Sequence, residues 1–458
     1  MANKIDAYIA ANEARHFQEM FELLRIPSVS SQKTRQAETR RCAEWTAAHC
    51  RTIGLKAEVI DTQGHPVVLA EWLGKPGKPT ILIYGHYDVQ PEDPVKLWNS
   101  PPFEPTVKGC KLFARGAVDD KGQFFAHLKA IEAHLKTAGE LPLNIKLILE
   151  GEEEIGSPSL PAFLERHQER LANNLLVISD SGMYKKGIPT ITLGLRGISY
   201  FQLNLRSCKT DLHSGSFGGA APNAGVAAGQ IIAKLKDEKG KIQVPGFYDD
   251  VRPITAAEKA SFDSLPFDEQ AFMDEIGLKA LVGEEGYSTL ERMWVRPTLD
   301  VNGLLSGYTG EGAKTVIPAE AMIKVSMRLV PDQDPEKIRQ AFEAYVRRIT
   351  PQGVDLEVLY FQGSVAYVAD PSHPAFKAAV EALEEGFNAK AAYTREGGSI
   401  PIVNDMTRRF GVSCLLLGLG LPDENAHAPN EYLDLDNWRA GVRTFAHFYG
   451  KLGELGAF

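Results

Sequence analysis

Cysteine is scarce in this chain: only five of its 458 residues are cysteines, and they are scattered along its length. Their number is odd and none belongs to a C-x-x-C pair, which argues against a disulfide framework and against a zinc site built from thiolates. This usage is typical of a reducing compartment, so we expect a cytoplasmic protein. The cysteines are Cys42, Cys50, Cys110, Cys208 and Cys414.

Long apolar runs and an excess of positive charge are also missing. No segment approaches the run of about 18 apolar residues that a membrane helix needs. The start "MANKIDAYIAANEARHFQEM" is polar and helix-like, so we expect no signal peptide there. The formal net charge is -9. We therefore expect no nucleic-acid partner and no membrane partner.

Two well-known signature loops are absent as well. The chain has no G-x-G-x-x-G and no G-x-x-x-x-G-K-[ST] motif, which argues against a nucleotide-binding enzyme. The stretch "GGSIP" lacks the final glycine of G-x-S-x-G, the nucleophile motif of a large class of serine hydrolases. Neither a nucleotide-binding enzyme nor a serine hydrolase is therefore favoured.

The apolar residues that are present follow two different patterns. In residues 1–195 and again in 370–458, short apolar strands alternate with amphipathic helices, which predicts a mostly parallel sheet flanked by helices. In residues 196–369, stretches such as "ISYFQLNLRS" and "AEAMIKVSMRLVP" alternate apolar and polar residues, and two long helical patterns accompany them. We therefore expect an α/β domain that is interrupted by an inserted, antiparallel α+β domain.

Several predicted strands of the α/β domain are followed by carboxylates or imidazoles. In an open α/β sheet, ligands bind outside the carboxyl ends of the strands. Carboxylates and imidazoles suit divalent zinc, manganese or cobalt, and so many anions would repel one another unless cations neutralised them. The pattern predicts a metal site drawn from His86, Asp88, Asp119, Asp120, Glu152, Glu153, Glu154, Asp180 and His427.

Each of these residues taken alone also has an ordinary structural explanation. Asp119 and Asp120 could favour the N-terminus of the helix that follows them. Three consecutive glutamates usually form a solvated face, Asp180 could belong to a turn, and His427 could be a surface histidine. These explanations do not account for the position of every such group beyond the carboxyl end of a strand, so we favour the metal site.

The sequence resembles the M20 family of metallopeptidases, in particular the dipeptidase branch with its carnosine-type and non-specific cytosolic dipeptidases. Eight motifs carry the resemblance, and they run in the family's order from residue 81 to residue 431. Some are weak singly, but together they are highly specific. They are "GHYDVQP", "ARGAVDDKGQ", "EGEEEIGS", "SDSG", "DLHSGSFGG", "KTVIPAEA", "REGGSIP" and "AHAPNE".

The resemblance implies two divalent metal ions per chain. Zinc is expected first, with manganese or cobalt as alternatives, because the same ligands accept all three. By analogy with the family, one ion is held by His86, Asp119 and Asp180. The other ion is held by Asp119, Glu154 and His427, so that Asp119 bridges the two.

Residues beside the ligands also match family positions. Asp88 is expected to accept the second N–H of the His86 ring, which fixes the tautomer of this ligand. Glu153 matches the general base, which takes a proton from the water between the metals and passes it to the leaving amine. The family match, rather than the residue type, decides which of the three consecutive glutamates is the base. The bond between Asp119 and Asp120 matches a cis peptide bond.

The inserted domain and a loop near residue 399 carry the remaining matches. His213 matches a histidine that stabilises the oxyanion, often in the active site of the partner subunit; it could instead be a surface histidine. Arg328 matches an arginine that binds the carboxylate of the substrate; its alternative is a strand-surface arginine. Ser399 and Gly398 match a loop on the substrate side, and a plain turn is the alternative there.

The resemblance therefore implies a hydrolase that cleaves the peptide bond of dipeptides or similarly small peptides. We expect a catalytic domain formed by residues 1–195 and 370–458, and a lid and dimerisation domain at 196–369 through which the chain forms a homodimer. One alternative is an N-acyl amino acid deacylase or carbamoylase of the same family, whose substrates also end in a carboxylate. Another is a metal-dependent binding protein without turnover, which would have no need of the base Glu153.

Overall fold

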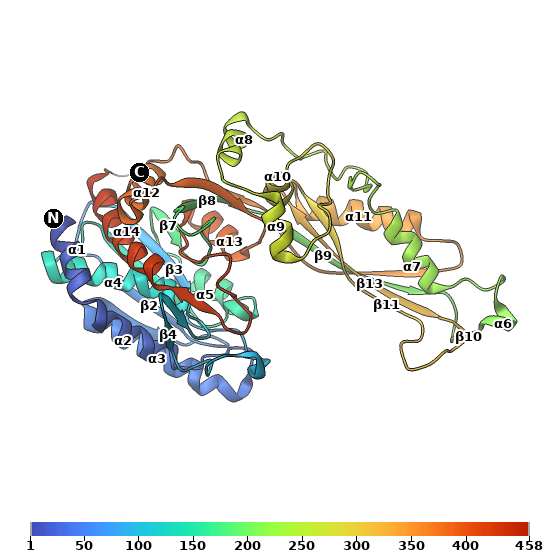
Figure 1. The fold of residues 1–458 in the computed structure, drawn as a ribbon, viewed down its shortest axis with the longest axis horizontal. Coiled ribbons are helices and arrows are strands. Elements are labelled where there is room, and N and C mark those ends of the chain that lie inside the picture. Colours follow the sequence, from blue (N-terminus) through green and yellow to red (C-terminus); the bar gives the residue numbers. More distant parts are fainter. Residues whose placement is uncertain (1, 457–458) are drawn as a thin grey trace. The chain divides into compact units, whose positions relative to one another are not determined.

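The computed structural model describes residues 2–456, and these residues form two compact units. The larger unit contains the chain up to Leu193, Ala369–Thr394 and the chain from Asp405 onward. In Figure 1 the blue N-terminal and red C-terminal segments lie together in this unit. The inserted unit contains Gly194–Val368 and Arg395–Asn404. The domains expected from the sequence were 1–195 with 370–458, and 196–369; the segment Arg395–Asn404 is part of the inserted unit here.

A nine-stranded mixed sheet forms the centre of the larger unit, which confirms the predicted α/β class. Its four middle strands, β6, β3, β7 and β17, are parallel. The strands toward both edges pair antiparallel, so the parallel character predicted from the apolar runs is confined to the middle. The order is β1 (Lys56–Ile60), β2 (Val67–Trp72), β6 (Asn144–Glu150), β3 (Thr80–His86), β7 (Leu175–Ile178), β17 (Ser413–Leu416), β8 (Thr190–Leu195) and β15 (Tyr367–Val368), with β16 (Ala392–Glu396) also paired to β8.

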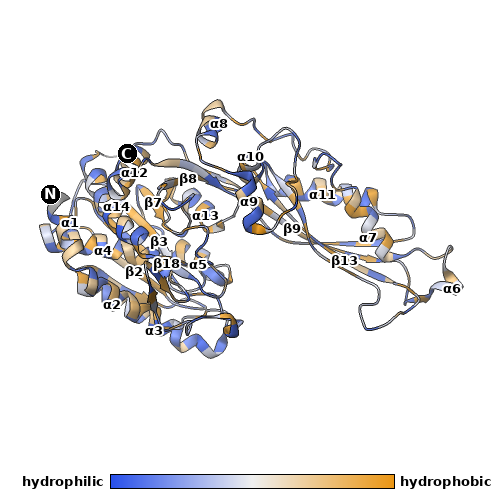
Figure 2. Ribbon diagram, viewed as in Figure 1, coloured by the Kyte–Doolittle hydropathy of each residue, from blue (hydrophilic) through white to orange (hydrophobic). Residues whose placement is uncertain are grey.

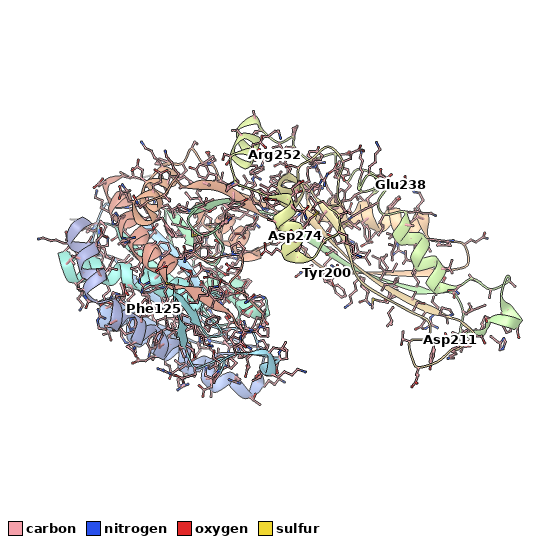
Figure 3. The ribbon with its side chains drawn as sticks, viewed as in Figure 1. Phe125, Tyr200, Asp211, Glu238, Arg252 and Asp274 are labelled. Atoms are coloured by element: carbon pink, nitrogen blue, oxygen red, sulfur yellow. The ribbon has the colours of Figure 1, made fainter. Side chains whose placement is uncertain are left out.

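Helices cover this sheet, and α4 (Lys121–Ala138) lies deepest among them. Every residue of α4 from Lys121 to His134 is buried, because the helix contacts β3 and four other helices. Figure 2 shows hydrophobic residues on β3, which α4 contacts, and Figure 3 shows Phe125 among the helices. The other helices are α1 (Ala2–Ala11), α2 (Glu13–Leu24), α3 (Gln36–Ile53), α5 (Leu160–Arg166), α12 (Pro374–Phe387), α13 (Pro401–Phe410) and α14 (Leu435–Glu454).

The inserted unit is built on a four-stranded antiparallel sheet, as its alternating sequence predicts. In β9 the odd-numbered residues Phe201, Leu203 and Leu205 are buried with residues of the helices on that face, while Tyr200 points to the other face (Figure 3). The strand order is β11 (Thr298–Ser306), β13 (Glu320–Leu329), β9 (Gly197–Arg206) and β14 (Asp355–Ser364). The helices on the buried face are α7 (Ala224–Ala233) and α11 (Pro335–Ile349).

Shorter elements complete both units. Those of the larger unit are β4 (Thr106–Lys108), β5 (Lys111–Phe113), β18 (Tyr432–Asp434) and the 3-10 turns η1 (Lys33–Arg35), η2 (Val95–Leu97) and η3 (Glu153–Ile155). Those of the inserted unit are β10 (Leu212–His213), β12 (Val316–Ile317), α6 (Ser214–Phe217), α8 (Ala256–Asp263), α9 (Glu269–Ile276) and α10 (Thr289–Trp294).

Two further observations on residues 2–456 concern the cysteines and the apolar character of the helices. All five cysteines carry free thiols. None of the helices in this part of the chain combines the length and the apolar character required to traverse a bilayer.

Candidate metal centre

The five predicted metal ligands lie together in the larger unit. His86 is the last residue of β3, and its register partner is Glu150 at the end of β6. Because these strands are parallel, their carboxyl ends lie at the same edge of the sheet. Potential ligand atoms come together there in two groups of three, with all atoms of a group within 4.8 Å of one another. The groups are His86, Asp119 and Asp180, and Asp119, Glu154 and His427.

Asp119 belongs to both groups and uses a different oxygen in each. Its Oδ1 lies 3.0 Å from Nε2 of His86, and its Oδ2 lies 2.8 Å from Nε2 of His427. Oδ2 of Asp180 lies 3.7 Å from Nε2 of His86, and Oε2 of Glu154 lies 3.2 Å from Nε2 of His427. A carboxylate arranged in this way can bridge two cations. The peptide bond between Asp119 and Asp120 is cis, as predicted.

The His86 ring is held from its other side by Asp88. Nδ1 of His86 lies 3.1 Å from the backbone oxygen of Asp88 and 3.4 Å from its carboxylate, so the backbone oxygen is the nearer acceptor. The carboxylate of Asp88 accepts the backbone N–H groups of Glu153 and Glu154, each at 3.2 Å. Asp88 therefore connects the His86 loop to the glutamate loop, a link that the sequence analysis did not foresee.

The charges around the two groups show that the centre attracts cations. Hydrogen bonds to Asp119 and Glu154 raise the pKa of His427 to about 10. Burial lowers the pKa of His86, but hydrogen bonds to Asp119, Asp180 and Asp88 outweigh it and hold this pKa well above its ordinary value. A field that favours protonated imidazole has the sign that also favours a bound cation. The donor set, three imidazole or carboxylate groups around each position, fits a zinc ion that keeps one place free.

Glu153 lies beside the two groups without belonging to either. It begins the 3-10 turn η3, which directs Glu153 and Glu154 differently. Burial raises the pKa of Glu153 to about 8; the negative charges of Asp180, Glu154 and Asp119 add to this, while His86 opposes it. A carboxylate with such a pKa can both accept and release a proton near neutral pH.

In the inserted unit, Arg328 is connected to the loop that contains Ser399. Nη1 of Arg328 donates to Oγ of Ser399 at 2.9 Å, and this hydroxyl donates to the backbone oxygen of Arg196 at 2.5 Å. The backbone N–H of Arg196 donates to the oxygen of Gly398, and its Nε donates to the oxygen of Gly397, both at 3.0 Å. Arg328, Ser399 and Gly398 were predicted as substrate-binding residues; Arg196, which holds the loop in place, was not.

His213 lies at the end of β10 in the same unit, and it is exposed. Its Nδ1 accepts the backbone N–H of Gly215 at 3.0 Å. A neutral histidine whose Nδ1 is an acceptor carries its proton on Nε2. The Nε2–H of His213 is therefore available as a hydrogen-bond donor.

A third group of potential ligands, Glu19, His49 and Glu132, lies among the helices. The buried ammonium of Lys129 already occupies the space between them. Its Nζ lies 2.5 Å from Glu19, 2.9 Å from His49 and 2.7 Å from Glu132. This internal cation replaces a metal ion at that place.

Comparison with known proteins identifies the family of this chain. The family model described as peptidase family M20/M25/M40 matches residues 82–451, which is well over half of the chain. The chain belongs to this family. The family match begins at β3 and ends within α14, so it spans both groups of candidate ligands.

Relatives and solved structures of the M20 family match nearly the full length. A Cys-Gly metallodipeptidase of Candida albicans is 34% identical over 451 residues, which cover 93% of each chain. The crystal structure of human carnosine dipeptidase 1 is 29% identical, covers 99% of both chains and superposes with a TM-score of 0.85. An M20 metallo-carboxypeptidase of Sulfolobus solfataricus is 32% identical, covers 96% of this chain and 99% of its own, and has the same TM-score.

Two further residues of this M20 chain bind the ligand residues, although the sequence analysis assigned them no role. Nε2 of Gln90 donates to Oε2 of Glu154 at 2.8 Å. The buried carboxylate of Glu431 accepts the backbone N–H of Asp119 at 3.1 Å. Both lie inside quoted motifs, "GHYDVQP" and "AHAPNE", so their motif membership was the only signal that could have indicated them.

Proposed function

We propose that this M20 peptidase is a dipeptidase that requires two divalent metal ions, and that it cleaves the peptide bond of dipeptides or similarly small peptides. The observation that carries the proposal is the sharing of Asp119 between two groups of three ligand atoms, with the half-buried Glu153 beside them. The names of the relatives, a Cys-Gly metallodipeptidase and a carnosine dipeptidase, support the same substrate class.

The ligands proposed for the first ion are His86, Asp119 and Asp180, and those for the second are Asp119, Glu154 and His427. When bound, two such ions polarise the scissile carbonyl and lower the pKa of a water molecule toward 7. We propose zinc as the metal, with manganese or cobalt as alternatives that the same oxygen and nitrogen ligands accept.

Glu153 acts as the general base. It takes a proton from the attacking water and later gives that proton to the nitrogen of the leaving amine. Asp88 fixes the backbone of Glu153 and Glu154 by accepting the N–H group of each.

The inserted unit supplies groups that bind the substrate. Arg328 pairs with the terminal carboxylate, for which a planar guanidinium is well matched. Ser399 and Gly398 form the adjoining wall, and the Ser399 hydroxyl keeps Arg328 oriented. The Nε2–H of His213 stabilises the oxyanion that develops on the scissile carbonyl.

We further propose that the chain forms a cytoplasmic homodimer through the inserted unit, which also acts as the lid. The apolar side chains of Leu304 and Leu305 on the edge strand β11 support a contact here, because they are 57% and 56% exposed. Whether His213 acts on its own chain or on the partner is then decided by mixing inactive His213→Ala and Glu153→Gln chains. Activity that reappears in the mixture shows that His213 acts across the dimer.

A substrate panel after chelation tests the function. The purified protein is stripped of metal, resupplied with zinc, manganese or cobalt, and assayed on dipeptides, tripeptides, N-acetyl amino acids and N-carbamoyl amino acids. We expect hydrolysis of dipeptides only after metal is restored. Preferential turnover of the N-acyl or N-carbamoyl compounds would instead assign a deacylase or carbamoylase, and metal binding without any turnover would assign a binding protein.

A further inference from the structure

Glu431 is the most completely hydrogen-bonded carboxylate near the centre. Its side chain is fully buried, and it follows the His427 loop directly before β18. Oε2 accepts from Nη1 of Arg115 at 2.8 Å and from the N–H of Gly116 at 2.9 Å. Oε1 accepts from the N–H of Val118 at 2.9 Å and from the N–H of Asp119 at 3.1 Å. An ionised carboxylate offers about four acceptor positions, and all four are used here.

All four donors belong to residues 115–119, the segment that ends in the shared carboxylate of Asp119. Three backbone N–H groups between Gly116 and Asp119 converge on one side chain, so the path of this loop depends on where Glu431 lies. The last of the three belongs to Asp119 itself, whose Oδ1 and Oδ2 face different groups of ligands.

Arg115 extends the connection to a third loop. Its Nη2 donates to the backbone oxygen of Pro91 at 3.2 Å, in the segment that follows His86 and Asp88. The pair of Arg115 and Glu431 is fully buried. It therefore joins the loops that contain His86, Asp119 and His427, which come from distant parts of the chain.

We propose that Glu431 is a positioning residue of the metal centre: by binding the N–H of Asp119, it aims one oxygen of that carboxylate at each metal position. The inference rests on the proposed two-metal centre and assigns to it a residue that touches neither ion. Second-sphere partners of this kind typically account for 10–100-fold in metal affinity.

Removal of one partner of a buried charge pair also destabilises the fold strongly, so stability alone does not identify a positioning residue. Glu132 supplies the matched control. It is also buried, in α4 of the same unit, and it pairs with Lys129 and Arg15. Its partners lie among the helices and include none of the proposed metal ligands.

The test compares full-length Glu431→Gln, Glu431→Asp and Glu132→Gln with the wild-type chain. Zinc affinity is measured by competition with a chromophoric chelator, and the unfolding midpoint of each metal-free protein is measured by circular dichroism. In Glu431→Gln an NH₂ group, which accepts no hydrogen bond, replaces one oxygen, so two of the four donors lose their acceptor. In Glu431→Asp the charge remains, but the side chain is too short to serve both sides of the loop.

We expect both Glu431 variants to bind zinc 10–100-fold more weakly at both positions, because the positions share Asp119. Glu132→Gln should unfold more easily yet bind zinc as the wild type does. Wild-type zinc affinity in either Glu431 variant would overturn the proposal, as would an equal loss of affinity in Glu132→Gln. If Glu431→Gln does not fold, Glu431→Asp alone decides.

Because zinc affinity is measured apart from dipeptide hydrolysis, the role of Glu431 and the proposed function can fail independently. If the wild type binds two zinc ions but cleaves no dipeptide, the dipeptidase proposal fails while the role of Glu431 stands. If the wild type cleaves dipeptides and the Glu431 variants keep their zinc affinity, only the role of Glu431 fails.

Discussion

Nε2 of His427 lies 2.8 Å from Oδ2 of Asp119, although the segment Gly194–Val368 of the inserted unit separates the two residues in the sequence. The other oxygen of Asp119 faces His86. The two groups of candidate ligands therefore share one carboxylate, while each histidine belongs to one group only.

Substitution of the shared and unshared ligands should give different metal contents. Asp119→Ala removes a ligand from both positions, and we expect the bound metal to fall from two ions toward none. His427→Ala removes a ligand from one position, and we expect one ion to remain with His86, Asp119 and Asp180. Elemental analysis after equilibration at a fixed free zinc concentration measures both. Loss of only one ion in Asp119→Ala would contradict the bridging role.

Glu153→Gln should remove turnover while the metal remains. The amide has the same shape but cannot take a proton from water, and general base catalysis typically contributes 10²–10⁴-fold. We expect kcat to fall by about that factor with two ions still bound. The neighbouring Glu152 is the control: it is buried and accepts the backbone N–H groups of His65 and Ser159, so Glu152→Gln should affect stability more than kcat. Equal losses of kcat in the two variants would refute the assignment of the base.

Arg328→Met should weaken the recognition of a free carboxylate. A hydrogen bond to a charged group contributes about 1.5–3 kcal/mol, which corresponds to roughly 10–150-fold in kcat/KM. We expect this loss with dipeptides and little change with dipeptide amides, which have no terminal carboxylate. Ser399→Ala removes the acceptor that orients Arg328 and should cause a smaller loss in the same direction. A loss of equal size on dipeptides and amides would mean that Arg328 does not read the carboxylate.

The Lys129 cluster predicts a pH dependence of stability. Burial, and then the charge of Lys129, lower the pKa of His49 to about 4. The unfolded chain therefore binds a proton at His49 between about pH 6.5 and pH 4 that the folded chain does not, so stability falls as the pH drops through this window. The contribution of one such group is at most about 1.4 kcal/mol per pH unit.

His49→Gln should accordingly flatten the stability profile between pH 6.5 and pH 4. Urea unfolding of both proteins measures the difference in the free energy of unfolding. Chelator is present so that both proteins are metal-free, and the other histidines then contribute equally to the two profiles. The groups around His49 are Lys129, Glu19, Glu132 and Arg15, and all of them remain in the variant. Parallel profiles of the two proteins would show that His49 is not held neutral in the folded state.

The sequence predicted that the candidate ligands after strands lie close together, because parallel strands end at one edge of a sheet. His86 and Asp180 are in this position, after β3 and β7. The bridging role of Asp119 and the choice of Glu153 came from family resemblance, since the residue types alone leave several carboxylates equivalent. The fold class followed from the apolar periodicities, whereas the antiparallel edges of the large sheet did not.

Contacts between distant polar residues were beyond prediction from one sequence. Lys129 would be read as solvent-facing on an isolated helix, but α4 is covered on all sides, so this ammonium needs Glu19 and Glu132. Glu431 looks like one more polar loop residue until its four donors are in place. The segment Arg395–Asn404 packs with the inserted unit through contacts such as that of Ser399 with Arg328, which no local pattern reveals.

Anomalous diffraction from crystals grown with zinc tests the central claim most directly. The account predicts two strong peaks per chain. One lies among His86, Asp119 and Asp180, and the other among Asp119, Glu154 and His427. A single peak, or peaks at other places such as the Lys129 cluster, would contradict it.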